Sequence, residues 1–227
     1  MVFVKICGIT DRRTAQLAGD LGADALGFVF APSSRRISPE AARSIISSLP
    51  AGVLKIGVFV DAPVAEVQEI ADFCRLDAVQ LHGTESPEYC AALNVPVIKA
   101  FRVKGRETLS EANRYRVAAV LLDAYVAGKA GGTGRTFHWQ TVRDWVPPAP
   151  VILAGGLAVD NVLAAIRSVR PAGVDVSSGV ETDGKKDTAK IRAFIQTVRR
   201  VGDAAGRERL LRVLRRAICT GNVDAGT

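Results

Sequence analysis

The chain of 227 residues is 48% hydrophobic and carries a formal net charge of +7. This length suits one domain, or at most two small ones, and the hydrophobic fraction is ample for one buried core. The basic residues form no stripe interleaved with aromatic residues, which argues against nucleic-acid binding, whereas a modest positive excess suits an anionic small-molecule substrate.

Short apolar runs alternate with amphipathic stretches as far as about residue 201. The apolar runs predict strands at 2–7, 25–30, 54–60, 78–82, 97–101, 119–123, 151–154 and 174–177. The stretches that follow them predict helices at 11–21, 39–49, 63–74, 86–94, 107–115, 138–146, 158–169 and 187–201. Ser38 and Ser86 each stand before a proline at the first helical position, and Asn161 and Asp187 are short polar side chains at later helix starts.

Eight units of a strand followed by a helix, with no change in residue composition that would mark a second domain, predict an α/β fold. We expect a single closed (β/α)8 TIM barrel over residues 1–202. An open doubly wound sheet is the competing architecture. The glycine-rich stretch 124–135 predicts a mobile loop after the sixth strand. Residues 203–227 hold five arginines and three acidic residues, and they follow a barrel that is already complete. We interpret them as an appended basic C-terminal extension, partly disordered, in which 207–216 could form a short helix.

The four cysteines form no CxxC pair and have no companion histidine spacing, which argues against a zinc site and a disulfide framework. Reduced thiols in an intracellular compartment are the simpler interpretation. The sequence shows no signal-peptide pattern and no apolar run approaching the ~18 residues needed to span a bilayer. We therefore expect a cytoplasmic protein with no metal and no membrane partner.

Cys7 ends the first predicted strand and stands directly before Gly8. A buried cysteine is more often a small core residue, but the carboxyl end of a barrel strand is where catalytic residues lie, so Cys7 is a candidate base or nucleophile. Nearby positive charge would have to favour the thiolate. Strand alternation places Lys5 on the same inward face, where Asp175 of the adjacent eighth strand could pair with it. Asp175 could equally face the substrate.

Asp123 ends the sixth predicted strand, well away from the first around an eight-membered ring. The alternative to a catalytic role is a turn-forming aspartate at the start of the loop. An acid on one side of a small substrate and a base on the other are the minimal equipment for moving protons across a sugar. We therefore predict that Cys7 and Asp123 form the catalytic pair.

Further polar residues follow the other strands. Arg36 and its neighbour Arg35 lie after the second strand, where one of them is expected to bind a carboxylate or phosphate. Gln80 and His82 end the fourth strand and are candidate substrate-binding residues. A structural, hydrogen-bonded His82 and a catalytic His82 are equally open, and its position at the barrel mouth favours substrate contact over deep core packing. The turns Gly155-Gly156 and Ser177-Ser178-Gly179 follow the last two strands, the usual phosphate site of such barrels.

Together these residues resemble the phosphoribosylanthranilate isomerase family of tryptophan biosynthesis over about residues 2–201. The matching motifs are Lys5-Ile6-Cys7-Gly8-Ile9-Thr10, Ser34-Arg35-Arg36, Gln80-Leu81-His82-Gly83, Leu122-Asp123, Gly131-Gly132-Thr133-Gly134, Leu153-Ala154-Gly155-Gly156 and Asp175-Val176-Ser177-Ser178-Gly179. The resemblance implies an Amadori rearrangement without cofactor or metal, with Asp123 as general acid and Cys7 as general base. It further implies that Arg36 holds the anthranilate carboxylate, that the two glycine turns hold the phosphate and that the Gly131–Gly134 loop covers the substrate.

Two features depart from the family pattern: His138 stands where an Asp or Asn is usual, and the segment beyond residue 202 has no counterpart. The related sugar-phosphate isomerase of histidine biosynthesis is the nearest alternative, but the resemblance to that enzyme would imply two catalytic aspartates and two phosphate sites. Indoleglycerol phosphate synthase is a weaker alternative, because Lys99 lies in mid-strand. A catalytically silent phosphate-binding barrel is the alternative of another class. A monomer and a homodimer remain equally open.

Overall fold

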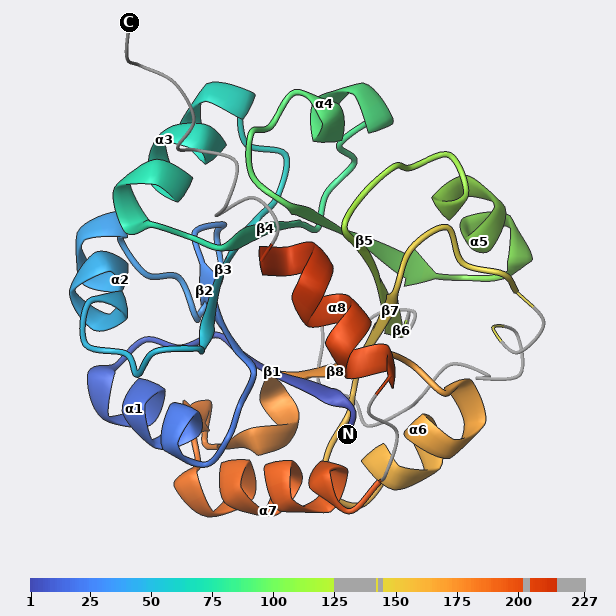
Figure 1. The fold of residues 1–227 in the computed structure, drawn as a ribbon. Coiled ribbons are helices and arrows are strands. Elements are labelled where there is room, and N and C mark those ends of the chain that lie inside the picture. Colours follow the sequence, from blue (N-terminus) through green and yellow to red (C-terminus); the bar gives the residue numbers. More distant parts are fainter. Residues whose placement is uncertain (125–141, 143–144, 202–204, 216–227) are drawn as a thin grey trace, which may run out of the picture.

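The computed structural model describes residues 1–124, 142, 145–201 and 205–215. Eight parallel strands close into a barrel in chain order, with β8 paired to β1 (Figure 1). The strands are β1 (Phe3–Cys7), β2 (Ala25–Val29), β3 (Leu54–Phe59), β4 (Ala78–Leu81), β5 (Val97–Val103), β6 (Ala119–Ala124), β7 (Val151–Ala154) and β8 (Gly173–Val176). The predicted (β/α)8 barrel is therefore confirmed. An open sheet is excluded, because each of the eight strands is paired on both sides and none forms an edge.

Helices surround the barrel in the ring seen in Figure 1. They are α1 (Arg12–Asp20), α2 (Pro39–Ile46), α3 (Val64–Cys74), α4 (Pro87–Ala91), α5 (Arg106–Ala112), α6 (Val162–Val169) and α7 (Thr188–Arg199). The side chains of Ser38, Ser86 and Asp187 cap α2, α4 and α7 as predicted. The predicted helix 138–146, the predicted loop 124–135 and His138 fall almost entirely outside the described residues.

Strand alternation divides the apolar side chains into two layers. Inside the barrel lie small and branched residues, among them Ala25, Ile56, Ile98 and Leu121. The residues between them in sequence, such as Leu26 and Val120, pack between the sheet and the helices. Phe3 belongs to the inner set, and Lys5 and Cys7 alternate with it along β1, so the prediction that Lys5 and Cys7 share the inward face is confirmed.

A helix from the C-terminal segment, α8 (Ala205–Arg215), lies across the end of the barrel at which the strands begin (Figure 1). Leu210 and Leu214 are fully buried and join the inner cluster that contains Phe3. Arg207 of α8 and Arg199 of α7 both bind the Asp24 carboxylate, at 2.6 and 2.8 Å. The expected basic helix therefore exists, and its apolar face closes the barrel.

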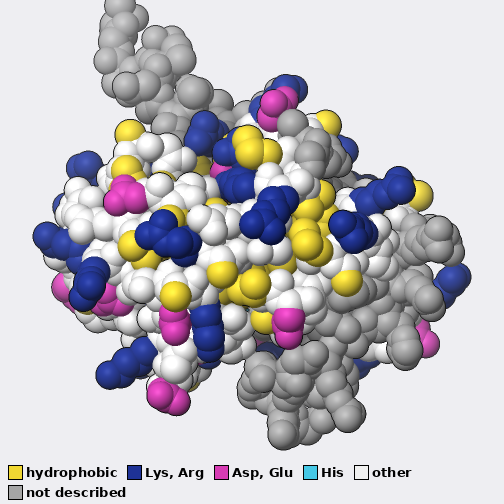
Figure 2. All heavy atoms as spheres, turned by 90° about the horizontal axis from the view of Figure 1, so that it is seen from below, with side chains coloured by type: hydrophobic (Ala, Val, Ile, Leu, Met, Phe, Trp, Pro, Cys, Tyr) yellow, Lys and Arg dark blue, Asp and Glu magenta, His cyan; other side chains and the backbone are white. Residues whose placement is uncertain are grey.

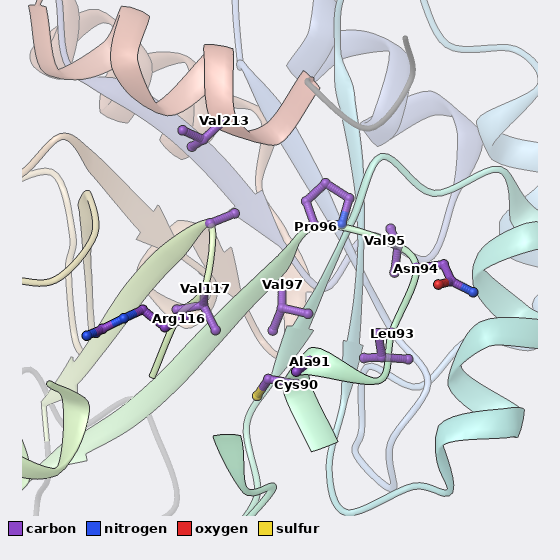
Figure 3. A pocket seen from close by; sticks show the side chains of 11 residues that line it. Cys90, Ala91, Leu93, Asn94, Val95, Pro96, Val97, Arg116, Val117 and Val213 are labelled. Atoms are coloured by element: carbon purple, nitrogen blue, oxygen red, sulfur yellow. The ribbon is translucent and has the colours of Figure 1, made fainter. Parts of the chain in front are cut away.

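The same end of the barrel carries a hollow between α4, the start of β5 and α8 (Figure 3). Cys90, Pro96, Arg116 and Val213 are among its lining residues. Because Pro96 and Val97 mark where β5 begins, this hollow lies at the opposite end of the strands from Cys7.

The surface charge is dispersed on the face viewed in Figure 2, where lysine and arginine side chains form separate groups among polar and apolar atoms. Acidic side chains lie between several of these groups. In the described part of the chain, no helix combines the length and apolar character needed to cross a membrane.

Candidate active site

Three inward side chains at or near the carboxyl ends of strands are polar. Cys7 ends β1, Gln80 lies near the end of β4, and Asp123 lies near the end of β6. Around the ring, β7 and β8 stand between β6 and β1, so the thiol and the Asp123 carboxylate face the axis from well-separated positions. The barrel thus presents the two predicted catalytic groups at one rim.

Cys7 is buried beside a pair of opposite charges. The Lys5 ammonium lies 3.0 Å from the Asp175 carboxylate, which confirms the predicted ion pair. Burial raises the pKa of the Cys7 thiol above its ordinary value, and the positive charges of Lys5 and Lys186 act against that rise. The site therefore contains the cations that a thiolate requires, but desolvation outweighs them in this state. Whether Asp175 also contacts a substrate stays a prediction.

Asp123 is joined to the end of β4 by side-chain hydrogen bonds. The Nε2 atom of His82 lies 3.2 Å from the Asp123 carboxylate, and its Nδ1 atom lies 3.2 Å from the Gln80 amide nitrogen. With the amide in this orientation, Nδ1 accepts from Gln80 and Nε2–H donates to Asp123. The Gln80 oxygen is buried and has no partner within the described residues. Gln80, His82 and Asp123 thus form one connected set.

The loop that carries His82 is held by a second buried ion pair, on the outer side of the sheet. Lys99 and Glu85 lie 2.9 Å apart, and Lys99 also donates to the Gly83 carbonyl at 2.8 Å. The Glu85 carboxylate accepts from the backbone N–H groups of Gly83 and Asp61. Hydrogen bonds thus hold both the N–H and the carbonyl of Gly83, the residue after His82. They fix the backbone from which the His82 imidazole extends.

The two predicted phosphate turns lie against each other. Gly155 and Gly156 adopt positive φ angles of 86° and 66°, which favour glycine. A Cβ on Gly179 would lie 1.8 Å from the Leu157 carbonyl oxygen, so only glycine permits this approach. Asn161 accepts from the Ala158 N–H and donates to the Gly156 carbonyl, instead of capping α6 as expected. The turns after β7 and β8 therefore form one shared surface.

The two adjacent arginines have different roles. Arg35 binds the Glu181 carboxylate through two nitrogens, at 2.7 and 2.6 Å. Arg36 is exposed, and its side chain has no ion-pair partner among the residues that the structure describes. Because Arg35 is already neutralised, Arg36 is the arginine of this loop whose charge is available to a ligand.

Glu181 and Lys186 were not predicted as site residues. The Lys186 ammonium lies 2.6 Å from the Glu181 carboxylate and also donates to the carbonyl of Ser177. These residues belong to a two-stranded hairpin, β9 (Glu181–Thr182) and β10 (Lys185–Lys186). Its turn, Asp183-Gly184, has positive φ at both positions, and Asp-Gly is a strong sequence signal for such a turn. That signal could have found the hairpin, although not its ion pairs.

The fold and this rim define the class of protein: a (β/α)8 barrel with acid–base groups and glycine turns at the carboxyl ends of its strands. No cluster of His, Cys, Asp and Glu that could hold a metal ion occurs among the described residues.

Comparison with known proteins identifies the family. The family model described as N-(5'-phosphoribosyl)anthranilate isomerase matches residues 4–197. The N-(5'-phosphoribosyl)anthranilate isomerase of Moorella thermoacetica is 52% identical over 223 residues, which cover 97% of this chain and 98% of that protein. The chain therefore belongs to the phosphoribosylanthranilate isomerase family. The family model ends before the extension, as expected, whereas this relative aligns also through the segment of α8 and so provides a counterpart for it.

Solved structures agree with this assignment. Phosphoribosylanthranilate isomerase from Thermotoga maritima is 44% identical, with a TM-score of 0.82, and the match covers 88% of this chain and all of that one. A phosphoribosylanthranilate isomerase in complex with reduced 1-(o-carboxyphenylamino)-1-deoxyribulose 5-phosphate is 42% identical, with a TM-score of 0.79 and the same coverage.

Proposed function

We propose that this chain converts N-(5'-phosphoribosyl)anthranilate to 1-(2-carboxyphenylamino)-1-deoxyribulose 5-phosphate, a step of tryptophan biosynthesis, by general acid–base catalysis. Family membership supports the reaction. The single structural observation that supports the mechanism is the placement of Cys7 and Asp123 on one rim, facing the barrel axis from separate strands. A sugar held between them would meet a base on one side and an acid on the other.

The proposed reaction begins at the ribose ring. Asp123 donates a proton to the ring oxygen as the bond between C1' and that oxygen breaks, and the anilino nitrogen supplies the electron pair of the new C=N bond. Cys7, as thiolate, then removes the proton on C2' and gives an enolamine. The enolamine loses its C2' hydroxyl proton and gains one at C1', which leaves the ketone. The hydrogen bond from His82 fixes the direction in which the Asp123 carboxyl group points.

Substrate binding is proposed for the groups that surround this pair. The backbone N–H groups of the Gly155-Gly156 turn and of the Ser177–Gly179 turn would hold the phosphate, because glycine lets an anion approach the chain closely. Arg36 would hold the anthranilate carboxylate. The unpaired oxygen of Gln80 offers an acceptor for a substrate N–H or O–H group. The ligand of the related structure carries both a carboxyphenyl group and a 5-phosphate, which supports these two subsites.

The test is turnover of phosphoribosylanthranilate, followed by the decay of its fluorescence. Cys7→Ser and Asp123→Asn should each lower kcat by roughly a hundredfold to ten-thousandfold while a product analogue still binds. Cys90→Ser is the matched control, since it makes the same change at the opposite end of the barrel. Near-normal turnover in Cys7→Ser would refute the assigned base, and no turnover by the unaltered protein would refute the proposed function.

We further propose a cytoplasmic protein that acts on this small molecule as a monomer or homodimer, without nucleic acid. Free cysteines support the location, and the dispersed charge on the face viewed in Figure 2 argues against nucleic-acid binding there. A related structure describes monomers generated from a dimeric Thermotoga maritima enzyme, which supports considering both states. Light scattering at several protein concentrations would separate them.

A further inference from the structure

The interior of the barrel holds a lysine that the proposed mechanism does not use. Lys5 has no exposed surface, and it lies on β1 one inward position below Cys7. A lysine is almost never buried unless its charge is paired, because desolvation of an ammonium is expensive. A methionine or leucine would fill the same space without that cost. The presence of the charge therefore calls for a second reason.

The geometry places the Lys5 ammonium beside the Cys7 thiol. Gly27 pairs with Cys7 across β1 and β2. A Cβ built on Gly27 would lie 2.7 Å from the Cys7 sulfur and 3.1 Å from the Lys5 Nζ atom. Both atoms therefore occupy the space that Gly27 leaves open, and the lysine side chain reaches upward from its own level to the level of the thiol.

Asp175 holds the lysine in this position. It pairs with Lys5 in the register of β1 and β8, and its carboxylate accepts from the ammonium at 3.0 Å. Burial acts to lower the pKa of Lys5, but Asp175 and Cys7 outweigh burial and leave that pKa above its ordinary value. The ion pair with Asp175 thus favours the charged form of Lys5.

We propose that Lys5, fixed by Asp175, is a positioning residue that stabilises the thiolate of Cys7. This inference rests on the proposed role of Cys7 as the base. Lys5 cannot touch the substrate, because none of its surface is exposed, so it acts only through the groups around it. Other charges also face Cys7: Lys186 from β10 and Arg35 from the loop after β2. Glu181 binds both of them, so much of their charge is already offset.

Three variants are expected to differ in the pKa of the Cys7 thiol, in an order that a purely structural role of Lys5 would not produce. Lys5→Met removes the cation and should raise the thiol pKa. Asp175→Asn removes the anion and should lower it. The double variant removes both, and because the Lys5 charge acts on the thiol more strongly than the Asp175 charge, its thiol pKa should lie above that of the unaltered protein and below that of Lys5→Met. The double variant also leaves no unpaired buried charge, so we expect it to fold even if a single variant does not.

The measurement is the rate of Cys7 alkylation by iodoacetamide against pH, read on the Cys7 peptide by mass spectrometry after digestion at sites other than lysine. Lys5→Met should alkylate roughly tenfold more slowly near pH 8, which corresponds to a rise of about one pKa unit. Its kcat should fall in parallel, with KM little changed. Lys99→Met is the matched control, because it removes a buried lysine paired to a carboxylate on the outer side of the sheet.

The outcomes are distinct. The predicted order of alkylation rates, with an unchanged rate in Lys99→Met, supports the inference. Equal Cys7 alkylation in the unaltered protein, Lys5→Met and the double variant overturns it and leaves a core ion pair. Neither result depends on turnover, so failure of the proposed base would be seen separately, as normal activity in Cys7→Ser.

Discussion

Gly179→Ala tests whether the joined glycine turns hold the phosphate. The new Cβ would lie 1.8 Å from the Leu157 carbonyl oxygen, whereas real Cβ contacts shorter than 3.0 Å essentially do not occur. The turn after β7 or the turn after β8 must therefore move by roughly 1.2 Å. A misplacement of about 1 Å can cost on the order of a hundredfold in rate when it disturbs substrate positioning.

We expect Gly179→Ala to raise KM strongly, to lower kcat/KM by roughly a hundredfold, and to cost about 1–3 kcal/mol of stability through overpacking. The assay combines steady-state turnover with thermal unfolding in the absence and presence of inorganic phosphate. The variant should lose the stabilisation against thermal unfolding that phosphate gives the unaltered protein. Gly105→Ala is the matched control, because its Cβ would meet only Glu107, at an ordinary 3.7 Å. A folded Gly179→Ala protein with unchanged KM would show that the phosphate lies elsewhere.

Three further predictions concern other parts of the molecule. Arg36→Met should raise KM roughly tenfold to a hundredfold with little change in kcat, as expected for a lost charged hydrogen bond; unchanged affinity would move the carboxylate contact to another residue. Leu210→Ala should cost about 2–5 kcal/mol in chemical denaturation without altering kcat, since the residue is fully buried far from the rim; a smaller loss would mean that α8 binds the barrel weakly. Burial alone would raise the pKa of Glu181, but Arg35 and Lys186 outweigh burial and leave that pKa below its ordinary 4.5. The ionised Glu181 therefore stabilises the fold above pH 4.5. This contribution is lost as the pH falls through the pKa of Glu181 in the folded protein. Glu181→Gln should flatten this acid limb in urea titrations, and an unchanged limb would contradict the assignment.

Strand positions and inward faces could be predicted from the sequence because both depend on local patterns. The Lys5–Asp175 pair followed from alternation within two strands and from closure of the ring, which makes β1 and β8 neighbours. The family followed from ordered motifs. The catalytic and binding roles of the rim residues stay predictions until they are measured.

The remaining features depend on contacts between distant segments. Arg35 and Glu181 are 146 positions apart, and nothing in either segment specifies that they meet. The extension was interpreted from its arginines, although Leu210 and Leu214 stand at helical spacing and form the face that is buried. A periodic apolar face shows that a helix needs a partner, but not which surface it will cover.

The position of α8 has a consequence for how the protein is made. The chain is synthesised from its N-terminus, so β1 is made before the two elements that bury its Phe3 side chain. The first is β8, which closes the ring, and the second is α8, which covers the open end. The inward packing of β1 is therefore complete only once the last described segment of the chain is available. The end of the barrel that α8 covers is thus built from the first and the last described elements of the chain, whereas Cys7 and Asp123 lie at the opposite end.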